Sequence, residues 1–386
     1  MTPFVFNTTK SVVFENGAAV RLAELAGRLL GRNCLLITDP GLRALGLCDP
    51  AIAALQAAGH TVTIFDAVEA DPSRETLMQA VEAGRAAGTT GVIGFGGGSS
   101  QDVAKLVALL LGSGEDLDSA WGVAQAKGPR LPLVLIPTTA GTGSEVTPVS
   151  IITVGAEEKR GVSSPVILPD MAILDAELTL GLPAHITAAT GVDAMVHAIE
   201  AYASKNANNN PVSKLLAREA LRLLGANIEG VVADGSNLEA RGAMLLGSML
   251  AGQAFANSPV AAVHALAYPI GGTFHIPHGL SNALVLPHVL RFNAPDASTL
   301  YAEIAADAFP ELAAVDGTQA RTAAFIDALA DLSARVGLQT RLRDVGIPKD
   351  AIGKMAADAM LQARLLVNNP RDVTQADAHT IYTAAW

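Results

Sequence analysis

Short apolar segments alternate with helical patterns over roughly the first 180 residues of the chain. Each apolar segment is rich in β-branched residues and closes at Gly, Pro or Asp, which is typical of a buried strand. The strands predicted in this way are residues 33–39, 61–66, 89–98, 131–139 and 171–175. Helical patterns accompany them over residues 17–31, 73–87 and 99–112. This alternation predicts a parallel sheet covered by helices, which is an α/β domain.

The pattern changes after residues 178–191. Helical periodicity then continues almost to the C-terminus without further strand signals, interrupted by polar or Gly/Pro-containing segments at 204–211, 233–238 and 268–279. We therefore place a domain boundary near residue 184. The predicted fold is an α/β N-terminal domain over residues 1–184 and an all-helical C-terminal domain over residues 185–386.

Composition and charge narrow the functional class. Half of the 386 residues are hydrophobic and only 16% are charged, which favours a compact globular enzyme over a disordered or scaffold protein. The formal net charge of −11 and the pI near 5.2 argue against nucleic acid and anionic membrane surfaces as partners.

The chain shows no signal for export or membrane insertion. Residues 1–10 contain no basic segment leading into an apolar run, so no signal peptide is predicted, and no segment is apolar over the length of a membrane span. Cys34 and Cys48 lie in apolar surroundings, where we expect them to fill the core rather than form a disulfide. A reduced, cytoplasmic compartment is the resulting prediction.

A glycine-rich segment follows the third predicted strand. In GVIGFGGGSSQDVAK, residues 91–105, a strand leads through a glycine loop into a helix. Glycines let backbone amides approach a phosphate closely, and the following helix N-terminus favours its negative charge. An ordinary turn is the alternative, which four glycines in five residues make the weaker interpretation. The loop departs from the usual dinucleotide fingerprint, because Ser99 stands at its last glycine position.

Two further segments at strand ends carry candidate cofactor-binding groups. Asp39 ends the first predicted strand, where its carboxylate can accept from an adenosine ribose and repel a 2′-phosphate, or can cap the next helix. The segment PTTAGTGSEVT, residues 137–147, could wrap a pyrophosphate and a nicotinamide, although a tight structural turn is the alternative. Its hydroxyl-bearing residues are Thr138, Thr139, Thr142, Ser144 and Thr147.

A pair of candidate metal ligands lies in TGVDAMVHAIEAY, residues 190–202. In a helix, Asp193 and His197 at positions i and i+4 share one face, as a two-ligand clamp requires. An Asp–His hydrogen bond at the helix surface is the simpler alternative. Because His264 lies in an apolar helical segment, where an imidazole without a partner is unfavourable, it strengthens the metal interpretation.

A third histidine completes the candidate ligand set. His278 precedes Gly279 near the start of the next predicted helix, and His275 lies three residues before it. One aspartate and three histidines would form a site suited to Zn²⁺ or Fe²⁺. The spacing leaves open whether His275 or His278 is the fourth ligand.

Five motifs together resemble those of the iron-containing (group III) alcohol dehydrogenases. They are GGGSSQDVAK, PTTAGTGSEVT, GVDAMVHAIEAY, HALAYPIGGTFHIPHG and NPRDVTQADAHTIYTAAW. The motifs occur in the family's order, and the match extends from about residue 10 to the C-terminus. The resemblance implies a Rossmann-like dinucleotide-binding N-terminal domain and an all-helical, metal-binding and catalytic C-terminal domain. Dehydroquinate synthase-like proteins share this architecture.

The resemblance also implies roles for individual residues. The implied metal ligands are Asp193, His197, His264 and His278, which selects His278 over His275. By the same resemblance, Gly97, Gly98 and Ser99 are expected to bind the pyrophosphate of the cofactor, and Asp39 is expected to bind its ribose. Asp102 and Lys105 are expected to brace the glycine loop rather than react. Other implied contacts with the NAD cofactor come from Thr138, Thr139, Thr142, Thr147 and Lys159.

Two departures from the family pattern concern the site. The family often carries a histidine, assigned to proton relay, where this chain has Tyr268, and Asp71-Pro72 replaces its usual Asn-Pro. Tyr268 and His275 are our candidate catalytic residues. For Tyr268 a proton relay, a pocket wall and plain core packing stay open, and we favour a wall with a polar tip.

The implied reaction is metal-assisted hydride exchange between NAD and a small primary alcohol, diol or hydroxy acid, in a homodimer or larger homo-oligomer. A tyrosine at the position of Tyr268 also occurs in a branch of the family that resembles hydroxyacid–oxoacid transhydrogenases, which act on 4-hydroxybutyrate-like acids. A hydroxy acid is therefore an alternative to a simple alcohol as substrate. A metal-free enzyme resembling maleylacetate reductases is disfavoured by the Asp and three His residues. A lyase resembling dehydroquinate synthase is disfavoured because Lys and Arg are scarce around residues 190–280.

Overall fold

The computed structural model describes residues 3–155 and 158–386, and these form two compact units. The α/β unit comprises Asn7–Thr139 and Gly143–Leu180. The helical unit comprises residues 3–6, Ala140–Thr142 and Gly181–Trp386. Two short segments that precede the predicted boundary near residue 184 therefore belong with the helices.

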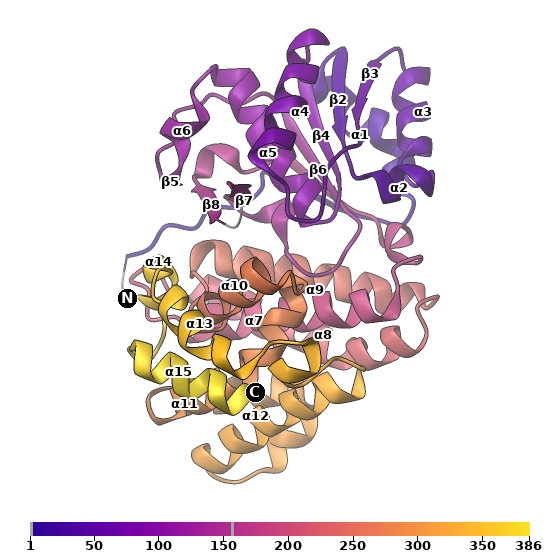
Figure 1. Ribbon diagram of the computed structural model, residues 1–386. Helices are drawn as coiled ribbons and strands as arrows, with labels where there is room; N and C mark the ends of the chain where they lie inside the picture. The colour runs from indigo at the N-terminus through magenta and orange to yellow at the C-terminus, as the bar shows by residue number, and fades with distance from the viewer. Residues whose placement is uncertain (1–2, 156–157) are drawn as a thin grey trace. The chain divides into compact units, whose positions relative to one another are not determined.

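A six-stranded parallel sheet forms the centre of the α/β unit (Figure 1). The strand order is β3-β2-β4-β6-β9-β1. All five predicted strands are present, and a strand that the sequence pattern did not reveal, β1, pairs with β9 at one edge. The strands are β1 (Ser11–Phe14), β2 (Asn33–Ile37), β3 (Thr61–Phe65), β4 (Gly91–Gly96), β6 (Leu133–Pro137) and β9 (Met171–Leu174).

A second, three-stranded sheet in this unit was not predicted. Its order is β5-β8-β7, and β7 pairs antiparallel with β8. The sequence EKRGVS of β8 breaks the apolar alternation that marks a strand, so its strand character depends on pairing with β7. The strands are β5 (Gly122–Val123), β7 (Val149–Val154) and β8 (Glu158–Ser163).

Helices cover both faces of the larger sheet. Successive residues of β2 point to opposite faces, and on each face they are buried in a separate core. Leu35 and Ile37 join one core with α4 and α5, whereas Cys34 and Leu36 join the other with α1 and α3. Cys34 and Cys48 are both buried free thiols, as predicted. The helices are α1 (Leu22–Leu30), α2 (Pro40–Ala44), α3 (Asp49–Ala57), α4 (Arg74–Ala86), α5 (Gly98–Ser113) and α6 (Leu117–Ala120), with 3-10 turns η1 (Ala18–Arg21), η2 (Ser144–Val146), η3 (Pro165–Ile167) and η4 (Ala176–Thr179).

The helical unit is organised around α7 (Ala184–Ala203). This helix packs against α8, α9 and α11 and is buried along almost its whole length from Thr187, as expected for a helix that is apolar on most sides. The other helices are α8 (Pro211–Ala233), α9 (Leu238–Asn257), α10 (Ala262–Phe274), α11 (His278–Ala308), α12 (Thr318–Arg335), α13 (Ile352–Ala359), α14 (Ala363–Leu366) and α15 (Gln375–Ala385), with 3-10 turns η5 (Pro310–Ala314), η6 (Leu342–Val345) and η7 (Lys349–Ala351). Among the described residues, no helix has the length and apolar character needed to cross a membrane.

Candidate active site

A stripe of polar side chains runs along one face of the otherwise apolar helix α7. Asp193, His197 and Glu200 occupy positions i, i+4 and i+7, and each is at least 95% buried. A buried ionisable side chain is costly unless it has a partner, so three on one face mark a place where polar groups meet.

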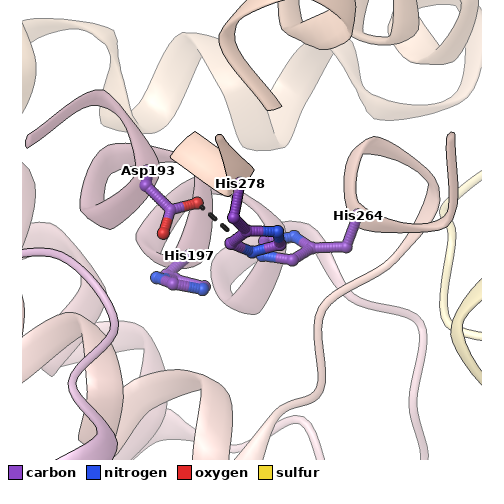
Figure 2. Close-up of side chains that lie close together, drawn as sticks. All are labelled: Asp193, His197, His264 and His278. Carbon is purple, nitrogen blue, oxygen red and sulfur yellow. Dashed lines mark ion pairs between the residues drawn. The ribbon is translucent and has the colours of Figure 1, made fainter. Parts of the chain in front are cut away.

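The four predicted ligands come together in the helical unit (Figure 2). Asp193 and His197 project from α7, His264 from α10 and His278 from the first residue of α11. One ligand atom from each side chain lies within 4.8 Å of those of the other three. Nε2 of His278 lies 3.8 Å from Oδ1 of Asp193, and the rings of His197 and His264 stack with centroids 4.7 Å apart.

Hydrogen-bond acceptors next to His264 and His197 determine which ring nitrogen of each histidine can bind a metal. Nδ1 of His264 donates to Oε2 of Glu200 at 2.7 Å, and Nδ1 of His197 donates to the Gly141 carbonyl at 3.2 Å. A carbonyl or carboxylate can only accept, so each imidazole carries its proton on Nδ1. Nε2 of both rings therefore keeps its lone pair for another partner.

The protonation states suit ligand chemistry. Burial lowers the pKa of His197 to about 3, and this effect outweighs the opposing influence of Asp193. Burial alone would raise the pKa of Asp193, but the three imidazoles and a hydrogen bond from Asn282 hold it below its usual value. Near neutrality the buried cluster thus offers a carboxylate and a neutral His197, which are the forms that bind a metal.

The cluster fits a divalent metal by its donor chemistry. Three imidazole nitrogens and one carboxylate oxygen form a set suited to Zn²⁺ or Fe²⁺. Three ligands are buried, whereas the side chain of His278 is 45% exposed and leaves one side accessible. A site with protein ligands and an accessible position is the arrangement of a catalytic rather than a closed structural metal.

The two candidate catalytic residues lie at different distances from this cluster. The ring of Tyr268, on α10, is half-buried and has its centroid 6.1 Å from that of His278. His275 is exposed at the C-cap of α10 with φ 56°, a left-handed conformation that non-glycine residues seldom adopt. Within the described chain, the four-residue cluster contains His278 and not His275.

The α/β unit gathers its candidate cofactor groups at one edge of the sheet. In the sheet, β3 pairs with one edge of β2, and the next strand along the chain, β4, pairs with the opposite edge of β2. Open α/β sheets bind nucleotides where the order reverses in this way, outside the carboxyl ends of the strands. Asp39 follows β2, Gly97 follows β4, and Thr138 and Thr139 follow β6.

The glycine loop has the geometry of an anion-binding turn. Gly97 is the N-cap of the 16-residue helix α5, and Gly98 and Ser99 are its first residues, whose amides have no partner within the helix. A side chain at Gly96 is excluded, because φ is 149° and an added Cβ would lie 2.8 Å from Ser100. The hydroxyl of Ser99 donates to the Ala70 carbonyl, which leaves its backbone amide for a ligand.

Several predicted cofactor residues have partners within the protein. Oδ1 of Asp39 accepts from the Leu42 amide at 2.9 Å and caps α2. One carboxylate oxygen of Asp39 therefore has the helix-capping role that the sequence offered as the alternative to ribose binding. Lys159 forms an ion pair with Asp71, the residue that departs from the family pattern. Thr142 belongs to the helical unit.

The Lys105 ammonium is fully buried beneath the hydroxyl-rich segment. It donates to Ser144 Oγ at 2.6 Å, Thr147 Oγ1 at 3.1 Å and the Val149 carbonyl at 2.7 Å. Ser144 in turn donates to Asp102 at 2.7 Å. Asp102 and Lys105 therefore brace this segment rather than the glycine loop that the sequence led us to expect. One predicted cofactor residue, Thr147, takes part in the brace.

Comparison with known proteins identifies the family. Residues 9–176 match the family model "Iron-containing alcohol dehydrogenase", and residues 187–386 match "Fe-containing alcohol dehydrogenase family, C-terminal". The chain belongs to the iron-containing alcohol dehydrogenase family. It is similar to long-chain-alcohol dehydrogenase 1 of Geobacillus thermodenitrificans, with 40% identity over 376 residues that cover 96% of this chain and 93% of the relative.

Solved structures of other proteins share this fold over full length. A 1,3-propanediol oxidoreductase superposes with a TM-score of 0.95 at 35% identity, with all of both chains covered. The sulfoacetaldehyde reductase of Bifidobacterium kashiwanohense, solved in complex with NAD⁺, superposes with a TM-score of 0.87 at 28% identity over 100% of this chain and 99% of that one. The fold class predicted from the sequence is therefore confirmed, and the protein is an oxidoreductase of the alcohol dehydrogenase type.

Three residues that contact the ligand cluster of this iron-containing alcohol dehydrogenase escaped the sequence analysis. Glu200 lies one helical turn beyond His197, and Asn282 one turn beyond His278, so spacing alone could have indicated both. Phe255, on α9, stacks on His197 with ring centroids 4.4 Å apart. No spacing signal connects Phe255 with the ligands, because α9 lies outside the two motifs that carry them.

Proposed function

We propose that this protein is an NAD-dependent alcohol dehydrogenase that uses Fe²⁺ or Zn²⁺. It would interconvert a small primary alcohol, diol or hydroxy acid with its aldehyde or ketone by hydride transfer. The gathering of Asp193, His197, His264 and His278 within 4.8 Å is the observation that carries the proposal. Membership of a family that uses NAD(P) and a divalent metal supports it. A metal-free reductase would have no need for a buried carboxylate among three imidazoles.

The four clustered side chains would hold the metal, and the surrounding side chains would shape the space for substrate. When bound, a divalent metal supplies Lewis acidity to the substrate oxygen and NAD accepts or returns the hydride. The rings of Phe255 and Tyr268 flank His197 and His278. We propose that these two rings wall the substrate position and exclude water from it.

Tyr268 and His275 remain the proposed catalytic side chains. Tyr268 is close enough to His278 to place its hydroxyl near a substrate. His275 is exposed at the end of α10, and we propose that its imidazole assists proton exit to solvent rather than contacts the reacting carbon.

The cofactor is proposed to lie along the carboxyl edge of the sheet. The amides of Gly97, Gly98 and Ser99 would hold the pyrophosphate, and Asp39 would accept from the ribose hydroxyls, which favours NAD over NADP. Further contacts are proposed for Thr138, Thr139, Thr142, Thr147 and Lys159. Of these residues, Thr147 and Lys159 would have to share their polar groups with Lys105 and Asp71.

The substrate is proposed to be small and to carry a terminal hydroxyl. The names of the relatives point to different substrates, a long-chain alcohol, 1,3-propanediol and sulfoacetaldehyde. What these substrates have in common is a terminal alcohol or aldehyde, and this supports the reaction type rather than one compound. A homodimer or larger homo-oligomer in the cytoplasm is part of the same proposal.

Metal analysis combined with a substrate panel tests the proposal. Wild-type protein reconstituted with Fe²⁺ or Zn²⁺ should hold about one metal per chain and should form NADH with primary alcohols or diols. His264→Ala should lose both metal and turnover. His185→Ala, which removes an exposed histidine from the same helix as His197, should keep both. A wild-type protein that turned over without metal would overturn the proposal in favour of a metal-free reductase, and turnover of hydroxy acids alone would point to the transhydrogenase-like alternative.

A further inference from the structure

Asn282 lies at the centre of the ligand cluster without being one of its members. It follows His278 by one turn of α11 and is 0% exposed. Its Nδ2 atom lies 2.6 Å from Oδ1 of Asp193 and 3.3 Å from Nε2 of both His264 and His278. Three of the four candidate ligand residues therefore have an atom within hydrogen-bond distance of one amide group.

The chemistry of the amide decides its orientation. With the amide reversed, its carbonyl oxygen would face a carboxylate oxygen at 2.6 Å, and two acceptors repel at that separation. The observed orientation places an N–H group against the anionic oxygen instead. This makes a short, charge-assisted hydrogen bond, which is stronger than a bond between neutral groups.

The distances also show which acceptor the amide serves. An amide nitrogen has two hydrogens and cannot serve three acceptors at once. The contact with Asp193 is 0.7 Å shorter than either contact with a histidine, so the carboxylate is its main partner. The contacts with the two histidine nitrogens are the longer and weaker ones.

The other end of the amide indicates that this orientation has a specific role. Oδ1 of Asn282 is buried and has no hydrogen-bond partner among the described residues. Buried polar atoms without partners are rare in folded proteins and unfavourable. An apolar side chain of similar size would avoid that cost, so retention of the amide calls for a compensating function of its N–H group.

We propose that Asn282 is a positioning residue of the metal centre and acts through Asp193. By donating to Oδ1, it fixes the rotation of the carboxylate and leaves the second oxygen of Asp193 to serve as a single-oxygen ligand. Asn282 itself does not bind the metal. This inference rests on the metal site proposed above, and it adds a residue on which the affinity of that site depends.

The first test measures metal affinity rather than turnover. Asn282→Leu removes the donor with little change in size, and Zn²⁺ dissociation constants are obtained by chelator competition. We expect Zn²⁺ binding to weaken about 10- to 100-fold, the usual effect of removing a group that orients a ligand. Asn293→Leu is the matched control. Asn293 is another buried asparagine of α11, whose amide donates to Tyr301 and Asn369 rather than to a ligand, and its replacement should leave the dissociation constant within about 3-fold of wild type.

The second test asks whether Asn282 acts through Asp193. In an Asp193→Ala background, the three histidines still provide a weak Zn²⁺ site, and Asn282→Leu should cost no further affinity there. Asn282→Ala provides the same comparison if the leucine variant does not fold. An equal loss with and without Asp193 would overturn the proposal, as would a single Asn282 variant that binds Zn²⁺ as tightly as wild type. Wild-type protein that bound no metal at all would instead overturn the metal site itself, and this inference with it.

Discussion

Oε2 of Glu200 lies 2.7 Å from Nδ1 of His264, and both side chains are buried in the helical unit. The other carboxylate oxygen of Glu200 accepts from the backbone amide of Val263 at 2.7 Å. Both oxygens are thus committed, one to the backbone of α10 and one to the imidazole. The arrangement is that of a carboxylate that orients a metal-binding histidine and fixes its tautomer.

Replacing Glu200 by glutamine should weaken metal binding. Glutamine has one carbonyl oxygen, so its amino group must face either Val263 N–H or Nδ1 of His264. In the second case His264 carries its proton on Nε2 and loses the lone pair directed at the cluster. We expect Zn²⁺ affinity to fall about 10- to 100-fold by chelator competition. Glu239→Gln, which alters an exposed glutamate of α9, should bind as wild type, and an unaffected Glu200→Gln variant would contradict this role.

Removing the hydroxyl of Tyr268 should have a modest effect on turnover. The ring can still pack beside His278 in Tyr268→Phe, so the metal should be retained. As a pocket wall, Tyr268 predicts a kcat loss of less than about 10-fold, because a true general acid or base contributes roughly 10²–10⁴-fold. KM for hydroxy acids should rise more than KM for simple alcohols if the hydroxyl contacts a carboxylate. A kcat loss beyond about 100-fold with metal intact would identify Tyr268 as the proton relay.

The choice between NAD and NADP should depend on Asp39. Since one carboxylate oxygen caps α2, replacement also removes a helix cap that contributes about 1 kcal/mol. Asp39→Ser keeps a capping oxygen but removes the negative charge, whereas Asp39→Gly removes both. We expect both variants to narrow the ratio of kcat/KM for NAD to that for NADP. A wild-type enzyme that used the two cofactors equally well would contradict the assignment of Asp39 to the ribose.

The stability of the protein should depend on pH through Glu145. Burial raises the pKa of this carboxyl to about 7, against the opposing influence of Lys105. The native state therefore binds a proton more tightly than the unfolded state, whose pKa is near the ordinary value of 4.5. The stabilising contribution is complete below that value and is lost as the pH rises through about 7.

Urea unfolding of wild type and Glu145→Gln checks this dependence. Glutamine stays neutral, so the free energy of unfolding of wild type relative to the variant should fall by up to about 3 kcal/mol between pH 5 and pH 8. Glu75→Gln, on the exposed side of α4, reports the general effect of removing a carboxylate. A difference between wild type and Glu145→Gln that did not change with pH would show that the Glu145 carboxylate is charged throughout.

The sequence pattern predicts those strands whose burial can be read from their own residues. The central strands β2, β4 and β6 are almost continuous apolar runs, because helices cover both faces of the sheet. In contrast, β1 has only four residues at an edge, and β8 contains Glu158, Lys159 and Arg160. The strand conformation of β1 comes from pairing with β9, which lies far away in the sequence. That of β8 comes from pairing with β7, whose sequence VSIITV is mostly apolar. Local pattern holds no information about such pairing.

The ligand cluster could be predicted in part for a similar reason. Asp193 and His197 share one helix face, so spacing alone makes them a pair. By contrast, spacing leaves open whether His275 or His278 joins that pair, and the family resemblance selects His278. The folded unit places His278 in the cluster, whereas His275 ends α10 in a left-handed conformation. Spacing also places Glu200 and Asn282 one turn from a ligand, but which ligand each of them contacts is seen only when α7, α10 and α11 are packed together.

The ligands obtain their positions from the protein's own hydrogen bonds, and this separates folding from metal uptake. Glu200, the Gly141 carbonyl and Asn282 already orient His264, His197 and Asp193. We therefore expect the polypeptide to fold before a cation arrives, unlike a zinc finger, which stays unfolded until it is loaded. On the proposed function, we expect chain made under metal starvation to accumulate in its folded form, and the supply of divalent metal would then set how much of it becomes active.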